Sequence, residues 1–430
     1  MRFISTRNSS ICQSLSSAIV SGLSSDGGLF IPEYSPPIDF KLFNSNTTLN
    51  LFSQNLLHPF FSGDALEKKL EKIIEKTLIF PFPLQKINAN TFMLELFHGP
   101  TCSFKDIGAR FLAECLTQIP QKNKTTIMVA TSGDTGSAVA SAFYLKQNLN
   151  VIILYPKGQI SQRQQQQITC WDNNILALAV EGTFDHCQKL VKSAFLDVWW
   201  QKHMHLNSAN SINIGRLLPQ MIYYAYSSVQ FYHCYQISPG YIIPTGNLGN
   251  AVACFWAKKM GFPIREIALS TNANKTIPEY LVTGEYKARK SISTLANAMD
   301  VGNPSNFERL QALFNSFNAF KSEVKAVSVS DENIKNTIRT VYTNYLKIIC
   351  PHTATAFFVR QQLSKQPWII VATADPFKFD CMIEQIIDVK IPKPPQLQRL
   401  LNKPASSIQV ISSLEEINKI IRLKNWSNAT

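Results

Sequence analysis

Two short stretches of the chain are near copies of each other, and their residue types suit the binding of anions. The first runs Ser132-Gly133-Asp134-Thr135-Gly136 and the second runs Thr245-Gly246-Asn247-Leu248-Gly249-Asn250. Each follows an apolar run that predicts a strand and precedes a small-residue run that predicts a helix. Glycines at such a turn let backbone N–H groups approach a ligand, and the helix dipole favours an anion there. One such loop could be only a turn, but two of the same design predict two phosphate-sized anions in one protein.

Lys105 lies in a run whose residues predict a turn followed by a helix. The run is His98-Gly99-Pro100-Thr101-Cys102-Ser103-Phe104-Lys105-Asp106. We expect the helix to begin at about Ser103, capped by Ser103 or Thr101, which places Lys105 in its first turn. The helix dipole there disfavours the ammonium form of the lysine. Most isolated lysines are only solvated. A neutral amine near phosphate-binding loops, however, is what a Schiff-base enzyme requires, because only that form attacks an aldehyde.

Short β-branched runs alternate with helical ones from Phe92 onward. The predicted strands are Ile127–Ala130, Val151–Tyr155, Ile175–Val180, Tyr241–Pro244, Ile267–Ser270 and Trp368–Ala372. Buried strands separated by helices predict an α/β fold with two open, mostly parallel sheets flanked by helices. Ligands of such sheets bind beyond the carboxyl ends of the strands, where the two loops lie. We therefore expect the sheets to face each other across a cleft.

The expected domain organisation has four parts. An N-terminal domain covers 1–90 and contains a turn at 26–29 and a charged helix at 65–76, and the polar segment after Pro83 predicts a connector. The other expected parts are a large domain formed by 91–125 and 226–392, a small α/β domain at 126–225, and a proline- and lysine-rich C-terminal appendage at 393–430.

The composition and charge of the chain bear on whether it binds nucleic acid, a membrane or small molecules. The 430 residues are 45% apolar and 17% charged, with a formal net charge of +13. The basic residues are scattered, which favours a diffuse field for anionic small molecules over a nucleic-acid groove. No apolar run approaches the roughly 20 residues that span a bilayer, so we expect no membrane partner. Nine cysteines stand singly without a CxxC pair. This pattern predicts neither a disulfide framework nor a metal site and favours a cytoplasmic location.

The run from His98 to Asp106 resembles the active-site lysine motif of threonine synthase, a pyridoxal-phosphate enzyme of fold type II. Other runs match that family in the same order along the chain: 22–29, 130–140, 207–213, 246–250, 294–300, 351–354 and 372–374. The match at 22–29 favours reading the serine-rich first 23 residues, which superficially resemble a transit peptide, as mature protein. The resemblance implies a fold like that of the tryptophan synthase beta subunit, with an extra N-terminal domain.

The resemblance also implies roles for individual residues. Lys105 would hold pyridoxal 5'-phosphate as a Schiff base and move protons. Gly246, Asn247, Leu248, Gly249 and Asn250 would cradle the cofactor's phosphate, and Thr373 would face the pyridine nitrogen. The substrate's carboxylate and phosphate would be bound by Thr101, Ser132, Gly133, Asp134, Thr135, Asn213 and Arg216, with the division between the two anions left open.

Several of these residues have a plainer interpretation. Arg216 could equally form a surface ion pair, and Asp134 could equally cap its helix. His98 and His352 are interpreted as structural groups, because Lys105 already supplies proton transfer. Three further positions depart from the family pattern: Cys350 stands for an acidic residue, Asp375 for a histidine, and Leu248 for a phenylalanine in the cofactor loop.

The reaction implied by the resemblance is the last step of threonine biosynthesis. O-phospho-L-homoserine and water would give L-threonine and phosphate by γ-elimination followed by β-addition. The closest alternative is a phospholyase or serine/threonine dehydratase of the same fold that releases a keto acid. An alternative of another class is a non-catalytic phosphate- or nucleotide-binding protein. We expect a small-molecule substrate, no nucleic-acid partner, and a monomer or homodimer.

Overall fold

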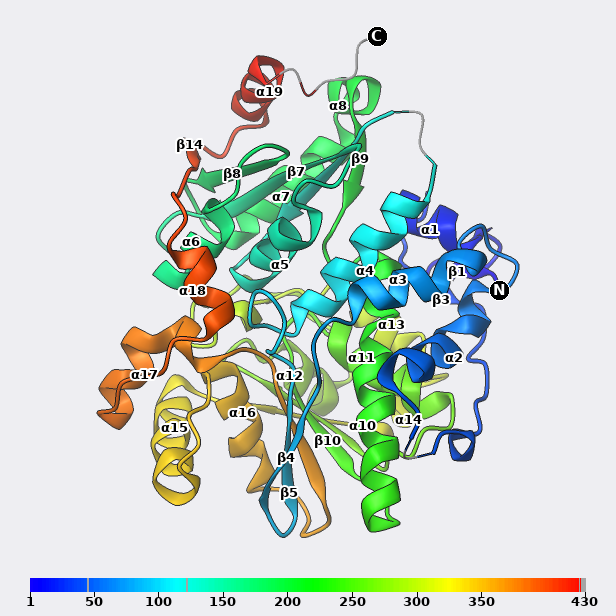
Figure 1. Cartoon of the computed structure of the whole chain (residues 1–430), viewed down its shortest axis with the longest axis vertical. Helices are drawn as coiled ribbons and strands as arrows, with labels where there is room; N and C mark the ends of the chain where they lie inside the picture. The colour runs from blue at the N-terminus through cyan, green and yellow to red at the C-terminus, as the bar shows by residue number, and fades with distance from the viewer. Residues whose placement is uncertain (45, 121–122, 425, 427–430) are drawn as a thin grey trace.

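The computed structural model describes residues 1–44, 46–120, 123–424 and 426. Two sheets with flanking helices lie one above the other, and a small N-terminal unit packs at their side, near the helix α4 (Lys105–Gln118) (Figure 1). In the described part of the chain, no helix is both long and apolar enough to cross a membrane.

The larger sheet has six strands in the order β12-β11-β10-β13-β5-β4. Their bounds are β4 Leu84–Asn88, β5 Thr91–Glu95, β10 Gly240–Pro244, β11 Ile267–Thr271, β12 Val324–Ser328 and β13 Trp368–Ala372. All neighbours are parallel except β4, which pairs antiparallel with β5. The segment after Pro83, expected as a connector, is therefore an edge strand. Exposed Gln85 and Lys86 on β4 are typical of a sheet edge.

Side chains at successive positions of the larger sheet enter two separate cores. Tyr241 and Ile243 of β10 pack in one hydrophobic core, while Ile242 packs in another. This alternation is the period of two of a strand buried on both faces. The helices around this sheet are α10 Gln220–Tyr235, α11 Gly249–Lys259, α12 Thr276–Thr283, α13 Phe307–Gln311, α14 Phe317–Glu323, α15 Asp331–Tyr345, α16 Pro351–Arg360 and α17 Asp380–Ile387, with 3₁₀ turns η3 Asn297–Met299 and η4 Pro376–Phe379.

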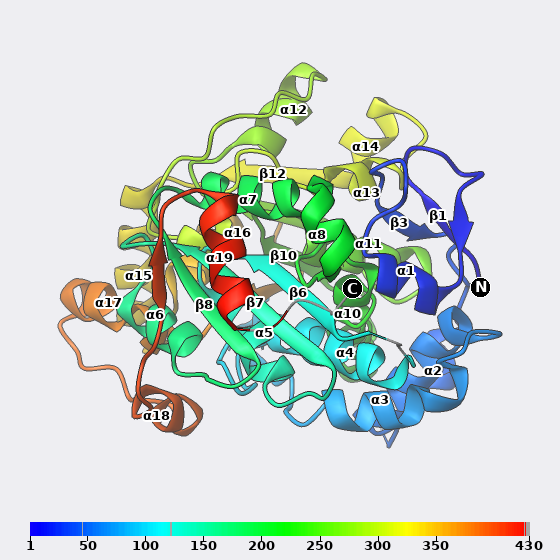
Figure 2. The ribbon, with the colours of Figure 1, turned by 90° about the horizontal axis from the view of Figure 1, so that it is seen from above.

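The smaller sheet has five parallel strands in the order β14-β8-β7-β6-β9. Their bounds are β6 Thr125–Ala130, β7 Leu149–Pro156, β8 Ile175–Val180, β9 His205–Ser208 and β14 Ile408–Val410. The helices of this part are α5 Asp134–Phe143, α6 Gln162–Thr169, α7 Phe184–Leu196, α8 Val198–His203, α18 Pro395–Leu401 and α19 Leu414–Leu423. The C-terminal segment runs along the outside of β8 and supplies its outer neighbour β14 (Figure 2).

The N-terminal unit is a three-stranded antiparallel sheet with helices. Its strands are β1 Phe3–Ser5, β2 Cys12–Gln13 and β3 Phe30–Pro32, and its helices are α1 Leu15–Ser21, α2 Leu49–Phe61, α3 Leu70–Thr77, η1 Phe40–Leu42 and η2 Glu67–Lys69. The charged helix expected at 65–76 is thus η2 followed by α3, whose apolar side is buried at Ile73 and Ile74.

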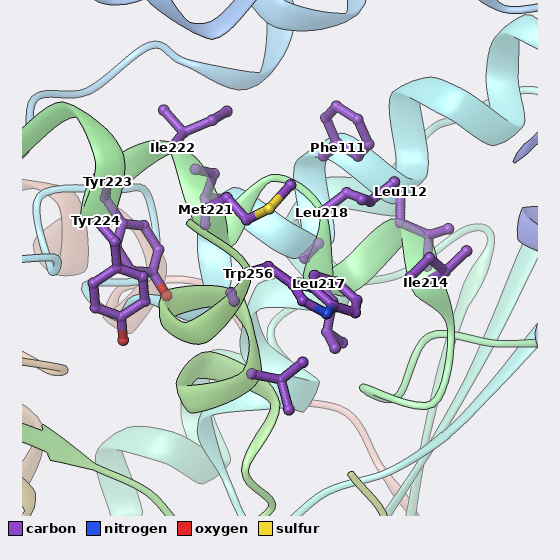
Figure 3. Close-up of a cluster of buried hydrophobic side chains, with 14 of the residues drawn as sticks. Phe111, Leu112, Ile214, Leu217, Leu218, Met221, Ile222, Tyr223, Tyr224 and Trp256 are labelled. Carbon is purple, nitrogen blue, oxygen red and sulfur yellow. The ribbon is translucent and has the colours of Figure 1, made fainter. Parts of the chain in front are cut away.

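A dense apolar cluster packs against the middle of α4. Phe111 and Leu112 of α4 pack with side chains of the short helix α9 (Ile214–Leu217) and of α10 (Figure 3). All five residues expected on the apolar side of α4 are buried, namely Ile107, Phe111, Leu112, Cys115 and Leu116. Because such packing tolerates little change in volume, it fixes how α4 lies against α9 and α10.

Candidate active site

One pocket lies between the two sheets and collects residues from the carboxyl ends of their strands. It contains Lys105, Arg216, Thr373 and both predicted anion loops. Of the expected site residues, the following line the pocket: Lys105, Ser132, Asp134, Thr135, Arg216, Gly246, Asn247, Leu248, Gly249, Asn250 and Thr373. Thr101, Gly133 and Asn213 are not among the residues that line it.

The loop at 245–250 is held by a threonine hydroxyl at the end of β10. Thr245 Oγ1 accepts the N–H of Leu248 at 3.2 Å and donates to Asn250 Oδ1 at 2.7 Å. Leu248 adopts φ +63°, which turns the chain into α11. Within the described residues, the N–H groups of Gly246, Asn247, Gly249 and Asn250 donate to no protein acceptor.

This loop fits a bound phosphate on two structural grounds. Free N–H groups gather at the start of the eleven-residue helix α11, where the dipole favours an anion. Gly246 has no room for a side chain, because a Cβ there would lie 2.7 Å from Met299 Cα.

The loop at 132–135 has the same construction on the other sheet. Thr131 Oγ1 accepts the N–H groups of Gly133 at 3.0 Å and Gly136 at 2.9 Å. Gly133 has φ +135°, and a Cβ on it would meet the Gln164 side chain at 2.4 Å. Gly133 thus shapes the loop, and its N–H is already bonded to Thr131.

Asp134 is the first residue of α5, but its side chain does not cap the helix. Its Oδ1 instead accepts Gln164 Nε2 at 3.0 Å and pairs with Lys378 Nζ at 2.7 Å. Burial alone raises the pKa of the Asp134 carboxyl, but Lys378 and then His352 more than offset burial, so the pKa lies below its usual value. Asp134 is therefore an ionised carboxylate with a buried cation beside it.

Lys105 is the first residue of α4 and so lies in its first turn as expected, although the helix begins two residues after Ser103. The N-cap is Phe104, without a side-chain hydrogen bond, and Thr101 Oγ1 donates to Asp106 Oδ1 at 2.6 Å. Ser103 and Thr101 therefore do not cap the helix, and the Asp106 carboxylate instead holds the preceding turn. The N–H of Phe104 donates to the carbonyl of Thr373 at 2.8 Å, which joins this turn to the end of β13.

The Lys105 amine is in a setting that favours its neutral form. Its side chain is half-buried, and Nζ lies 4.3 Å from the centroid of the Phe104 ring. Burial, and secondarily the Arg216 guanidinium, lower the pKa of Lys105 to about 8, while Asp134 opposes the shift. The direction agrees with the expectation from sequence, although burial rather than the helix dipole is the main cause.

Arg216 is buried and forms no ion pair among the described residues, so its interpretation as a surface ion pair is wrong. Nη1 donates to the carbonyl of Ala209, and Nε has no partner in that part of the chain. Burial lowers the pKa of Arg216 to about 10. A buried guanidinium with a free donor beside a pocket is suited to an anionic ligand.

Asn213 caps α9 and is fully used by the protein. Its Oδ1 accepts the N–H of Gly215 at 3.0 Å, and its Nδ2 donates to Ile19 O at 2.9 Å and Asn207 Oδ1 at 3.1 Å. These contacts tie α9 to the N-terminal unit, so Asn213 supports Arg216 instead of reaching the pocket.

The histidines and the unusual positions have local partners. His352 lines the pocket, and its Nε2 accepts the N–H of Ala298 at 3.1 Å. Burial lowers the pKa of His352 to about 4, so the ring is neutral at pH 7. His98 lies outside this pocket and pairs with Glu95 at 2.7 Å. Cys350 and Asp375 are the N-caps of α16 and η4, accepting the N–H groups of residues 353 and 377.

Arg309 is a supporting residue that the sequence did not indicate. It is fully buried and donates to the carbonyls of Phe30, Ser211 and Ile212 and to Asn306 Oδ1, at 2.7–2.9 Å. Asn306 Nδ2 in turn donates to the carbonyl of Asn247 at 3.0 Å. Arg309 therefore joins the N-terminal sheet to the loop at 245–250. Only its tertiary partners identify it, because no local motif surrounds it.

Lys192 at the mouth of the pocket was also not foreseen. It lies on α7 with Gln188, and both line the pocket. Lys192 is exposed and has no ion-pair or hydrogen-bond partner in the described chain. Ser208, Asn210 and Ser211 line the same pocket. These three lie within the run 207–213, in which only Asn213 had been given a role.

Three family models match successive parts of the chain. The model described as pyridoxal-phosphate dependent enzyme matches residues 75–373. Those described as threonine synthase N terminus and threonine synthase, C-terminal, match residues 2–78 and 352–421.

The chain is similar to whole threonine synthases as well. It is 39% identical over 409 residues to the threonine synthase of Haemophilus influenzae, covering 94% of this chain and 95% of that protein. The crystal structure of threonine synthase from Escherichia coli matches with a TM-score of 0.92 at 33% identity, covering 99% of this chain and 100% of that one. The pyridoxal-phosphate-bound threonine synthase from Brucella melitensis matches with a TM-score of 0.90 at 31% identity, covering 98% and 99%.

Proposed function

The chain belongs to the threonine synthase family of pyridoxal-phosphate-dependent enzymes, and we propose that the pocket between its two sheets is the active site. The protein converts O-phospho-L-homoserine and water to L-threonine and phosphate. Its fold is the type II fold of these enzymes with the additional N-terminal unit, and its cofactor is pyridoxal 5'-phosphate.

The loop at 246–250 would hold the cofactor's phosphate, and Lys105 would carry its aldehyde carbon. Four backbone N–H groups without acceptors among the described residues support the first assignment, and the lowered pKa of Lys105 supports the second. Thr373 would lie at the pyridine nitrogen, as the family resemblance implies; it lines the pocket just after β13, and its carbonyl accepts the N–H of Phe104. The bound cofactor supplies an electron sink for the substrate's Cα and Cβ.

Lys105 Nζ would also move protons once the substrate has displaced it. The Phe104 ring lies beside Nζ, and burial favours the neutral amine that can accept a proton. Neutral His352 is a poorer proton carrier at pH 7, because its pKa is about 4. One base at the start of α4 therefore serves the proton transfers of both the elimination and the addition.

The substrate's anionic groups would lie between the loop at 132–135 and Arg216. The N–H groups of Ser132, Asp134 and Thr135 donate to no acceptor in the described chain, and Arg216 has a free Nε. Lys192 would add a mobile positive charge at the entrance for the dianionic phosphate.

The observation that carries this function is that Lys105 lines one pocket with two loops whose backbone N–H groups have no acceptor among the described residues. The test is turnover of O-phospho-L-homoserine by the purified protein supplied with pyridoxal phosphate. We expect phosphate and L-threonine in equal amounts, and no product from Lys105→Ala. Release of a keto acid and ammonia in place of threonine would establish the dehydratase or phospholyase alternative.

A cytoplasmic enzyme is also part of this proposal. All nine cysteines are free thiols, which a reducing compartment preserves. Fractionation of cells that produce the native chain, with the protein detected by antibody, tests the location. Recovery in a membrane or extracellular fraction would contradict it.

A further inference from the structure

The loop at 132–135 contains an acid in a place suited to an anion. Asp134 begins α5 and lines the pocket. An unbalanced carboxylate there would repel the substrate's carboxylate and phosphate and would oppose the field of the helix start. The structure must therefore contain something that makes this aspartate compatible with an anionic ligand.

Lys378 is the group that does so. It lies on η4, just beyond the carboxyl end of β13, and its side chain is 0% exposed against 4% for Asp134. Nζ lies 2.7 Å from Asp134 Oδ1 and donates to the carbonyl of Thr101 at 3.0 Å. Lys378 does not line the pocket, so its charge acts on a ligand through Asp134.

The pair also fixes the direction of the carboxylate. Asp134 Oδ1 accepts both Lys378 Nζ and Gln164 Nε2, while the N–H groups at 132, 134 and 135 have no acceptor within the described residues. One carboxylate oxygen, Oδ1, is thus engaged by the protein, and the backbone donors stay free for a ligand. The same lysine holds Thr101, in the turn that leads to Lys105.

We propose that Lys378 is a positioning residue that neutralises Asp134 and thereby makes the loop at 132–135 a site for the anionic substrate. This inference rests on the proposed function of the pocket. Without Lys378, the carboxylate of Asp134 would stand unbalanced a few ångströms from the bound anion. Truncating one partner of a buried charge pair usually costs more than the pair contributes, because the other charge stays buried.

The test is a double-mutant cycle in the full-length protein supplied with pyridoxal phosphate. Lys378→Met should raise the KM for O-phospho-L-homoserine roughly tenfold to a hundredfold, with a smaller change in kcat. Adding Asp134→Asn to Lys378→Met should lower that KM again by at least about fivefold, because the unbalanced charge is gone. The matched control is Lys146→Met, which removes another lysine paired with a buried acid, Glu114, outside the pocket. We expect its KM to equal that of the wild type.

Two results would overturn the proposal. A KM of Lys378→Met equal to the wild-type value would show that the charge of Asp134 does not reach the ligand. A double variant that keeps the full increase would assign the effect to the lost contact with Thr101. If Lys378→Met does not fold, the double variant Lys378→Met with Asp134→Asn decides alone. A KM of this double variant tenfold or more above the wild-type value contradicts the proposal, because neither charge is then present.

Binding of inorganic phosphate separates this inference from the proposed function. Calorimetric titration of the same cofactor-loaded variants should give the same order of affinities as the KM values. A wild-type protein that makes no threonine refutes the proposed function, yet a phosphate affinity weakened by Lys378→Met and regained in the double variant would still support the ion-pair inference.

Discussion

Gly246 offers a direct test of the proposed cofactor loop, because the structure leaves no space for even one methyl group. A Cβ built on Gly246 would lie 2.7 Å from Met299 Cα and 2.9 Å from the Met299 carbonyl oxygen. These are backbone atoms, so no rotamer change can relieve the contact in Gly246→Ala. At Gly249 the nearest atoms are side-chain atoms at 3.3 Å and 3.4 Å. Gly249→Ala is therefore the graded control on the same loop.

The size of the effect follows from what must move. Relieving the Gly246 contact requires a displacement of the loop of about 0.5–1 Å, and overpacking of this kind costs about 1–3 kcal/mol. If the loop moves, its N–H groups no longer align with the cofactor's phosphate, and the free energy is lost from cofactor binding. We expect the Kd for pyridoxal phosphate to rise about tenfold to a hundredfold in Gly246→Ala and only a few-fold in Gly249→Ala.

Titration of each apo protein with pyridoxal phosphate, followed by absorbance, measures these constants. Thermal unfolding of the apo variants shows whether the loop or the whole fold has absorbed the strain. Equal affinities in all three proteins, or a larger loss at Gly249, would refute the assignment of this loop to the cofactor's phosphate.

Three other changes test the remaining parts of the site. Borohydride-trapped attachment of pyridoxal phosphate should rise with pH around a midpoint near 8, because only neutral Lys105 reacts. Arg216→Met should move this midpoint upward, because it removes a charge that lowers the pKa of Lys105. A midpoint near 10 in the wild type would contradict this prediction. Lys192→Met should raise the substrate KM several-fold, whereas exposed Lys189→Met on the same helix should not, and equal effects would indicate only general surface charge. Arg309→Met should lower the free energy of unfolding by about 3–5 kcal/mol, because buried acceptors lose their donor, and an unchanged melting temperature would refute that role.

The strands and loops of the two sheets could be predicted because their signals are local. All six predicted strands are present within a residue or two, since each is a continuous apolar run buried on both faces. Each anion loop needed only a strand end, glycines and a following helix, all adjacent in sequence. The apolar side of α4 followed from helical spacing alone.

Side-chain partners and short strands that depend on residues far apart in the chain could not be predicted from the sequence. Asp134 looks like a helix cap or a ligand until Lys378, far along the chain, is brought beside it. Thr101 was expected to cap α4, but Asp106 binds it from inside the helix. The short strands β4 and β14 lack a long apolar run, and pairing with β5 and β8 rather than propensity defines them.

The two anion loops rise from different sheets, each pinned by its own threonine. Any sliding or rocking of one sheet against the other would therefore change the spacing between the two proposed anion sites while leaving each loop undistorted. Substitutions around β6 and α5 could change the length of ligand that the site accepts without disturbing the loop at 245–250, which follows β10. Such modularity would give evolution, or an engineer, a way to alter selectivity while the proposed cofactor site stays fixed.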